Sequence, residues 1–151
     1  MKDFLLWLEG SMVRAIFLDD DHPSVNPNAS QRVVWFNEFK EKNNLNDNDI
    51  AWITTAREAI SLLKTGRIQY ISLDHDLMDS GHAEYPPDMP PQMLSHEQNM
   101  AILESGAKSG YDVARWIFHA VSNGSIPKLH WEIHSQNGIG RENMRRYLQN
   151  I

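Results

Sequence analysis

The amino-acid sequence predicts an α/β fold, with a central parallel sheet of four to five strands and helices on both faces. Two observations lead to this fold class. The chain has 151 residues, which is the length of one ordinary domain. Along it, short apolar runs typical of buried strands alternate with segments whose apolar residues recur at helical spacing. This alternation is typical of parallel sheets, because a helix usually connects two parallel strands.

Four short apolar runs predict the strands. They lie at residues 14–20, 50–55, 70–77 and 129–137. Right-handed crossovers between them would place neighbouring strands at a topological switch point, which is where α/β sheets bind their ligands.

Four helices are expected between and after these strands. The first runs from Ser30 to about Asn43, with Asn28 as its candidate cap. Each of the others has apolar residues at positions i, i+3, i+4 and i+7, the pattern of one buried helix face. These residues are Ala56, Ala59, Ile60 and Leu63; Val113, Trp116, Ile117 and Ala120; and Met144, Tyr147, Leu148 and Ile151.

We expect a single domain over residues 1–151, with two additions to the regular pattern. Residues 1–12 carry an apolar patch that is too short for a signal sequence and predicts an arm packed on the domain. Residues 78–108 contain four prolines and break the alternation, which predicts a long inserted loop or lid. Within this segment, Ser95 to Leu103 have the composition of a short helix.

The composition excludes several classes of protein. Lys and Arg number 14 and Asp and Glu number 20, which gives a formal net charge of −6. This balance does not favour binding to duplex nucleic acid or to an anionic membrane. The absence of cysteine excludes disulfide scaffolds, cysteine zinc sites and thiol catalysis. No apolar run approaches the ~20 residues of a membrane span, so we expect a location in the cytoplasm, of a cell or of a virus-infected host.

Acidic and polar side chains follow three of the predicted strands. They are Asp19 and Asp20; Asp74, His75 and Asp76; and His134, Ser135 and Asn137. The ends of adjacent parallel strands meet at one edge, so we expect these side chains to converge. Unit charges 4 Å apart repel by about 4 kcal/mol at an effective dielectric near 20. A divalent cation relieves that repulsion; oxygen ligands favour Mg²⁺ or Mn²⁺, and histidine ligands would allow Zn²⁺.

The residue types suggest a division of roles. Asp74 is expected to be the central metal ligand, with Asp20 opposite it and Asp19 and Asp76 beside or behind it. If the strand continues past Asp74, then Asp74 and Asp76 point to one face and His75 to the other. His134 is expected on the far side, either as a metal ligand or as a group that transfers a proton, because its ordinary pKa suits neutral pH.

The last predicted strand leads into a glycine-containing turn before the closing helix. Its residues are Asn137, Gly138, Ile139, Gly140 and Arg141. Free N–H groups at the start of a helix attract anions, and an arginine can bind two phosphate oxygens. We therefore expect Ser135, Asn137 and Arg141 to bind substrate. A turn of this kind is also common for geometric reasons alone.

Four motifs together resemble one family. FLDDDHP at residues 17–23, SLDHDL at 72–77, SGYDVARWI at 109–117 and HSQNGIGRENM at 134–144 are similar to the cyclic-phosphate processing receiver domains. The resemblance runs from about Val13 to Ile151 and covers residues 78–108 poorly. It implies a receiver-like, flavodoxin-like three-layer sandwich and a metal-dependent action on cyclic or linear phosphate compounds.

The resemblance also assigns residues. Asp19 and Asp20 match the acidic pair that holds a divalent metal in receivers, and Asp74 matches the aspartate that receivers phosphorylate. His75 and Asp76 match a pair typical of the cyclic-phosphate branch, and this places His75 among the substrate-binding residues. His134, Ser135 and Asn137 match the last-strand motif of that branch.

Three functions remain open at this point. The first is a metal-dependent phosphoesterase for a small phosphorylated or nucleotide ligand, with Asp74, Asp76 and His134 as catalytic residues; either activated water or Asp74 itself attacks phosphorus. The second is a receiver-type Mg²⁺-binding signalling or interaction module that is phosphorylated on Asp74. It is disfavoured because receivers carry a lysine at a later strand end, and Lys128 here begins its strand. The third is a non-catalytic nucleotide-binding protein. The sequence identifies no protein partner.

Overall fold

The computed structural model describes residues 12–27, 30–77, 81–135 and 137–151. The arm expected at residues 1–12 therefore lies, except for Met12, outside the described residues. The expected cap Asn28 lies outside them as well.

The described residues form one sheet of four parallel strands, as the sequence predicts. The strands are β1 (Ala15–Leu18), β2 (Ile50–Ile53), β3 (Tyr70–Leu73) and β4 (His130–Ile133), in the order β2-β1-β3-β4. Each strand is shorter than the run that predicts it, although the backbone N–H groups of Asp19, Asp74 and His134, just past three of the strand ends, still donate to carbonyls of the neighbouring strands. These are the residues that matter for the site.

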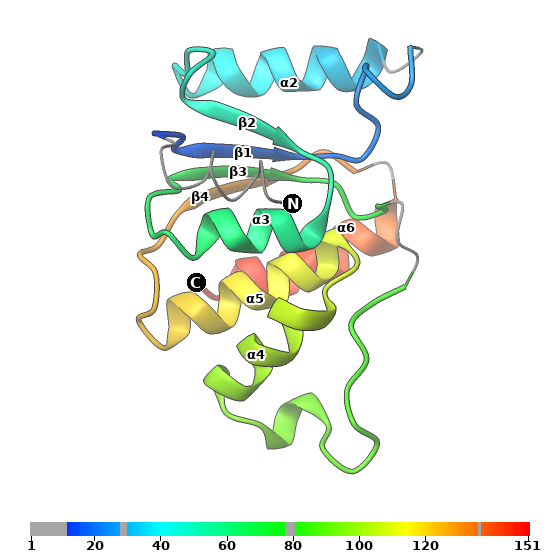
Figure 1. The fold of residues 1–151 in the computed structure, drawn as a ribbon, viewed down its shortest axis with the longest axis vertical. Coiled ribbons are helices and arrows are strands. Elements are labelled where there is room, and N and C mark those ends of the chain that lie inside the picture. The colour runs from blue at the N-terminus through cyan, green and yellow to red at the C-terminus, as the bar shows by residue number, and fades with distance from the viewer. Residues whose placement is uncertain (1–11, 28–29, 78–80, 136) are drawn as a thin grey trace.

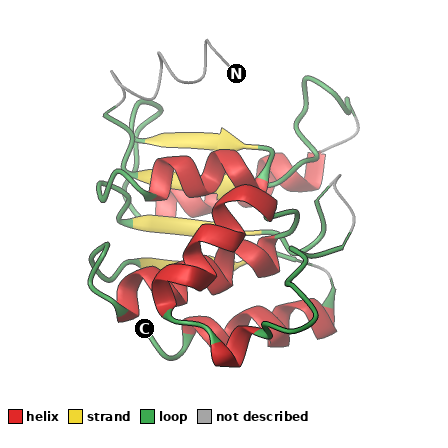
Figure 2. Cartoon of the chain, turned by 60° about the horizontal axis from the view of Figure 1, so that its bottom comes forward, coloured by secondary structure: helices red, strands yellow, loops and turns green. Residues whose placement is uncertain are grey.

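Helices cover both faces of the sheet and complete the three layers (Figure 1). Of the helices in the described residues, α2 (Ser30–Lys42) lies on one face. On the other face lie α3 (Ala56–Leu63), α5 (Gly110–Ser122) and α6 (Gly138–Leu148). Figure 2 shows helices of this second layer in front of the four strands. The α/β fold class is thus confirmed.

The core is divided by the sheet. In β1, Ile16 and Leu18 pack with the larger cluster toward α3 and α5, whereas Ala15 and Phe17 pack with the smaller aromatic cluster under α2. All four residues are fully buried. A central parallel strand is covered on both faces, which explains why its sequence is a continuous apolar run.

The second half of the segment predicted as a loop or lid is helical. Helix α4 (His96–Gly106) begins at Ser95, which forms a capping box with Gln98, and it packs on α5 outside the three layers (Figure 1). Its buried Leu103 belongs to the larger core cluster. Residues 96–106 are therefore helical, and the short helix expected from Ser95 to Leu103 extends three residues further. A 3₁₀ turn (Pro91–Met93) precedes it.

Within the part of the chain that the structure describes, no helix is both long enough and apolar enough to cross a membrane.

The strand register places the site. Leu18 at the end of β1 pairs with Leu73 of β3, which pairs in turn with Ile133 of β4. The next residues, Asp19, Asp74 and His134, therefore lie level with one another across three strands. Because β2 and β3 lie on opposite sides of β1, the edge beside β1 and β3 is the topological switch point.

Candidate functional site

Three carboxylates meet at the carboxyl edge of the sheet. Asp19, Asp20 and Asp74 each offer one oxygen atom, and these three atoms lie within 4.8 Å of one another. Asp19 and Asp74 are buried and Asp20 is half-buried. These three carboxylates, two of them buried, offer only oxygen ligands, and Mg²⁺ and Mn²⁺ prefer such a donor set. The residues present therefore fit a divalent cation.

The electrostatics of the cluster favour a cation or a proton. Burial, together with the charge of Asp19, raises the pKa of Asp74 to about 7. The pKa of Asp20 is raised for the same two reasons, in the same order. Desolvation and like charge both oppose ionisation, so the carboxylates are poised to exchange protons for a metal ion.

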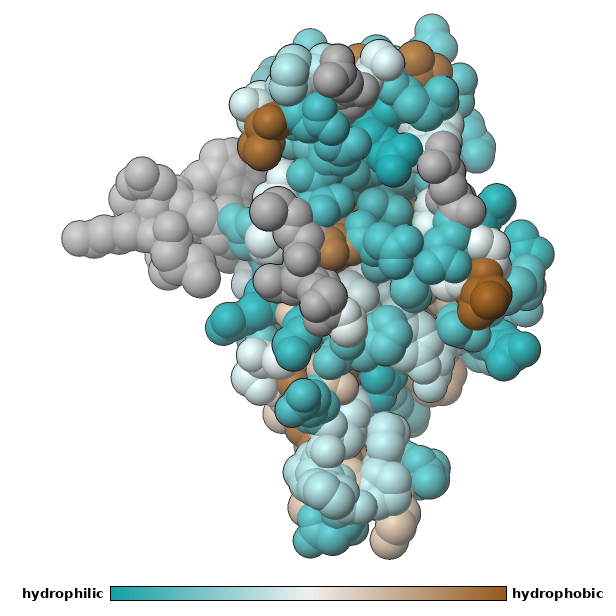
Figure 3. Space-filling view, turned by 90° about the vertical axis from the view of Figure 1, so that its right-hand side faces the viewer, coloured by the Kyte–Doolittle hydropathy of each residue, from teal (hydrophilic) through white to brown (hydrophobic). Residues whose placement is uncertain are grey.

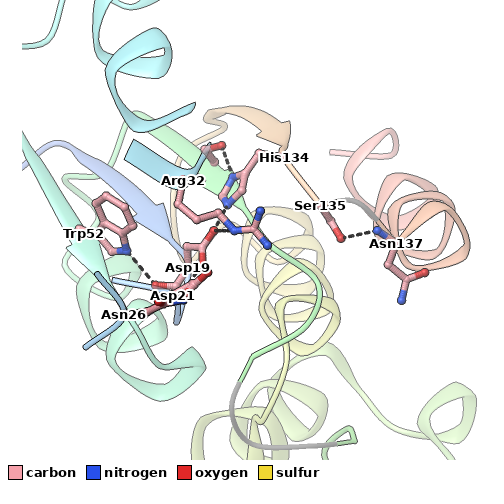
Figure 4. A network of polar contacts seen from close by, with 9 residues as sticks. Asp19, Asp21, Asn26, Arg32, Trp52, His134, Ser135 and Asn137 are labelled. Carbon is pink, nitrogen blue, oxygen red and sulfur yellow. Dashed lines mark hydrogen bonds and ion pairs between the residues drawn. The ribbon is translucent and has the colours of Figure 1, made fainter. Parts of the chain in front are cut away.

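Asp19 is held by three groups, and Figure 4 shows them converging on its carboxylate. Its Oδ2 atom lies 3.0 Å from His134 Nε2 and 3.1 Å from Arg32 Nε. The backbone N–H of Asp21 donates to Oδ1 at 2.9 Å. The side chain of Asp19 is fully buried, so these contacts fix its orientation at the base of the site.

His134 lies behind Asp19 and away from the open pocket. Its Nδ1 atom is 2.7 Å from Ser72 Oγ, and its ring stacks on Phe17 with the ring centroids 4.3 Å apart. Only 6% of its side chain is exposed. Both ring nitrogens are therefore occupied within the protein, and the side chain contacts Asp19 directly.

A pocket of about 310 Å³ opens beside the acidic cluster. Figure 3 looks onto this side of the molecule, whose surface is mainly hydrophilic. The residues that line the pocket are Asp20, Asp21, Val25, Arg32, Asp74, Asp76, Ser135 and Asn137. The pocket thus joins acidic groups from β1 and β3 to polar groups that follow β4.

Asp74 and Asp76 line the pocket and His75 does not, which is the alternation that the sequence suggests. Asp76 lies outside the three-carboxylate cluster and is exposed. Its Oδ1 atom is 2.7 Å from His75 Nδ1, and this hydrogen bond lowers the pKa of Asp76. The His75 ring packs against Gly140: a Cβ atom on Gly140 would lie 2.4 Å from the Cγ atom of His75. His75 therefore supports Asp76 from the side.

Ser135 and Asn137 form the opposite wall. Ser135 is buried, and its Oγ accepts a hydrogen bond from the backbone N–H of Asn137 at 3.1 Å. Asn137 caps α6, accepting from the backbone N–H of Gly140 at 2.8 Å. Its Nδ2 atom lies 3.4 Å from an Asp76 oxygen, which links the two walls. Arg141 is exposed on α6 and is not among the lining residues.

Comparison with known proteins gives one match. The family model of the cyclic-phosphate processing receiver domain matches residues 14–150. The chain belongs to this family. Searches of curated proteins and of solved structures gave no match. In this receiver domain the acidic cluster resembles a receiver metal site, and the family name indicates processing of cyclic phosphates.

Three lining residues of this receiver domain, Asp21, Val25 and Arg32, are not among the site residues expected from the sequence. Arg32 lies in the first turn of α2 and reaches the buried carboxylate of Asp19. A signal was present, because a cation is unfavourable near the positive N-terminal end of a helix dipole. A basic residue at that position, with no acidic residue in the same turn, indicates an anionic partner elsewhere in the fold.

The raised pKa of Asp74 predicts how metal binding depends on pH. A divalent ion needs the carboxylate, and below about pH 7 a proton competes for it. We expect the affinity for Mn²⁺ to fall by up to about tenfold per pH unit below that value and to level off above it. Calorimetric titration between pH 5.5 and 8.5, in buffers of different ionisation enthalpy, measures both the affinity and the released proton. An affinity that is constant over this range would contradict the assignment of Asp74 as a ligand.

Proposed function

We propose that this protein is a divalent-metal-dependent phosphoesterase that acts on a cyclic or linear phosphate or nucleotide compound. One observation carries the proposal. Two members of the three-carboxylate cluster, Asp20 and Asp74, line the same pocket as a set of groups able to bind an anion. Phosphate-ester hydrolysis needs this pairing, because a cation must contact the phosphoryl oxygens while other donors fix the ligand.

The metal ligands in this proposal are Asp20 and Asp74, with Asp19 and Asp76 close by. Mg²⁺ or Mn²⁺ suits them better than Zn²⁺, because His75 and His134 already contact Asp76 and Asp19. A bound divalent cation would supply a Lewis acid for the phosphoryl group and would lower the pKa of a bound water.

We assign the other roles in the reaction to side chains of the protein. The hydrogen bond from His75 lowers the pKa of Asp76, and Asp76 faces the pocket, so its carboxylate is placed to accept a proton from attacking water. Asp74 is the alternative nucleophile. The sequence suggests His134 as a general acid or base; because its ring is buried and both nitrogens are engaged, we propose that it acts by positioning Asp19.

The substrate-binding groups are Ser135 and Asn137, which follow β4. Asn137 also faces Asp76, so a ligand bound there lies next to the proposed base. His75 would act on the substrate only through Asp76. Arg141, outside the pocket lining, would reach a ligand that extends past the pocket, such as the remainder of a nucleotide. We place this activity in the cytoplasm, on a small ligand.

The test is ³¹P NMR of the protein with Mg²⁺ or Mn²⁺ and a panel of cyclic and linear phosphate esters. We expect a product resonance that grows over many turnovers and that is absent with Asp74→Asn. Asp88→Asn serves as the matched control, because Asp88 is exposed and lies outside the pocket lining. Its activity should equal that of the wild type.

Two other results would replace the proposal. A stoichiometric acyl phosphate on Asp74 after treatment with a small phosphodonor, without turnover of any ester, would indicate a receiver-type signalling module. Release of an unchanged ligand after denaturation would indicate a nucleotide-binding protein without catalysis.

A further inference from the structure

Among the described residues that line the pocket, Arg32 is the one with a positive charge. The others that carry charge are the acids Asp20, Asp21, Asp74 and Asp76. An arginine in such a pocket has two possible partners, the carboxylates around it or an anionic group on a ligand. Its contacts in the structure show how it is held between these two kinds of partner.

The contact between Arg32 and Asp19 is an ion pair without a directed hydrogen bond. Arg32 Nε lies 3.1 Å from Asp19 Oδ2. This Nε is nevertheless buried and forms no hydrogen bond with any residue that the structure describes, because its N–H is not aimed at the oxygen. A buried donor without a hydrogen bond is unfavourable. The guanidinium can therefore move away from Asp19 without losing a hydrogen bond of its Nε.

The guanidinium of Arg32 packs on Trp35 and extends toward the pocket. The guanidinium lies over the ring of Trp35, with its Cζ atom 4.8 Å from the ring centroid. Figure 4 shows its terminal nitrogens pointing away from Asp19 and toward the side where Ser135 and Asn137 lie. These nitrogens have the paired geometry that binds two oxygens of one phosphate group.

The charge of Arg32 also acts on the whole acidic cluster. Burial and the charge of Asp19 raise the pKa of Asp74 and of Asp20, and the positive charge of Arg32 opposes both changes. Arg32 therefore partly neutralises the three carboxylates that fit a divalent cation. A cation bound there and Arg32 would compete for the same negative charge and repel each other.

We propose that Arg32 is an exchangeable counter-ion, which pairs with Asp19 while the metal is absent and binds the phosphoryl oxygens of the ligand once a divalent cation is bound. The second half of this statement rests on the proposed function, because it takes the ligand to be a phosphate. A phosphate that touches both the cation and the arginine removes their repulsion. Metal and phosphate should therefore bind with positive coupling.

The experiment measures Mn²⁺ binding by electron paramagnetic resonance, with and without inorganic phosphate. In the wild type, phosphate should tighten Mn²⁺ binding by about tenfold. In Arg32→Gln, Mn²⁺ alone should bind about five- to tenfold more tightly than in the wild type, because the competing charge is gone, and phosphate should have little further effect. Arg57→Gln, at an exposed position on α3, is the matched control and should behave as the wild type.

Two results would overturn the proposal. One is weaker binding of Mn²⁺ alone to Arg32→Gln, which would mean that Arg32 supports the metal site. The other is the absence of coupling between phosphate and Mn²⁺ in the wild type, which needs no variant and so stands even if Arg32→Gln does not fold. Because neither measurement uses turnover, a protein that hydrolyses no ester but shows the coupling would refute the phosphoesterase and keep the role of Arg32.

Discussion

Replacing Asp74 with asparagine should abolish turnover and, in the metal-free protein at pH 8, increase the free energy of unfolding. Turnover is lost because the central ligand, or the nucleophile, is removed. Stability rises because Asp74 is 5% exposed and its ionised form is opposed by burial and by Asp19. Asparagine has nearly the same shape and no charge. Asp74 is thus needed to bind the metal, but its carboxylate destabilises the metal-free fold.

The sign follows from the pKa. The folded state raises the pKa of Asp74 from 3.8 to about 7, so between these values the folded protein binds more protons than the unfolded chain. The free energy of unfolding therefore falls as the pH rises through this window, and the full penalty is present above pH 7. The difference corresponds to at most about 4 kcal/mol. We expect Asp74→Asn to gain on the order of 2 kcal/mol at pH 8 and little at pH 4.

Urea unfolding of both proteins in the presence of a chelator, at pH 8 and at pH 4, measures this difference. A chelator is needed because a bound metal would stabilise the wild type selectively. A loss of stability in Asp74→Asn at pH 8 would show that Asp74 is well accommodated as a carboxylate, and that the cluster has no need of a cation.

Replacing Gly110 with alanine should damage both the fold and the site. A Cβ atom on Gly110 would lie 1.8 Å from the backbone oxygen of Asp74 and 2.8 Å from its carbonyl carbon. The first turn of α5 would have to move away from β3, which would break the hydrogen bond from Gly110 N to His75 O and displace Asp74. We expect a loss of about 3 kcal/mol in stability, at the upper end for an overpacked site.

Gly138→Ala is the matched control for this change. Gly138 is also the first residue of a helix that follows a capping side chain, Asn137, as Gly110 follows Ser109. A Cβ atom on Gly138 would meet nothing within 4 Å. Its substitution should leave the stability within about 0.5 kcal/mol or raise it slightly. Equal urea midpoints for the two variants would mean that the close approach of α5 to Asp74 does not contribute to the free energy of unfolding.

The sequence predicts the elements of this fold well because its apolar spacing is regular. It also places Asp19 and Asp74 at one edge, since adjacent parallel strands end together. The end of each strand is less predictable: the first run predicts a strand through residues 19 and 20, whereas β1 ends at Leu18. The backbone N–H groups of Asp19 and Asp74 still donate to neighbouring strands, so the sequence run extends past the regular strand to residues whose side chains belong to the site.

The directions of side chains and long-range partners are harder to predict. The sequence suggests proton transfer by His134, but the register of β4 turns its ring onto Phe17 and Asp19, under α2. Arg32 is remote from every motif and reaches the site only because α2 crosses that face of the sheet. Both facts depend on tertiary packing, which a local pattern does not contain.

Asp19, Asp20 and Asp74 are the residues that we propose as a metal centre. Titration of the protein with Mn²⁺ at pH 8, followed by electron paramagnetic resonance, tests this proposal most directly. We predict one saturable Mn²⁺ per chain in the wild type and in Asp88→Asn, and no saturable binding in a folded Asp74→Asn. Saturable binding of equal affinity in Asp74→Asn, or none in the wild type, would show that these carboxylates do not form a metal centre.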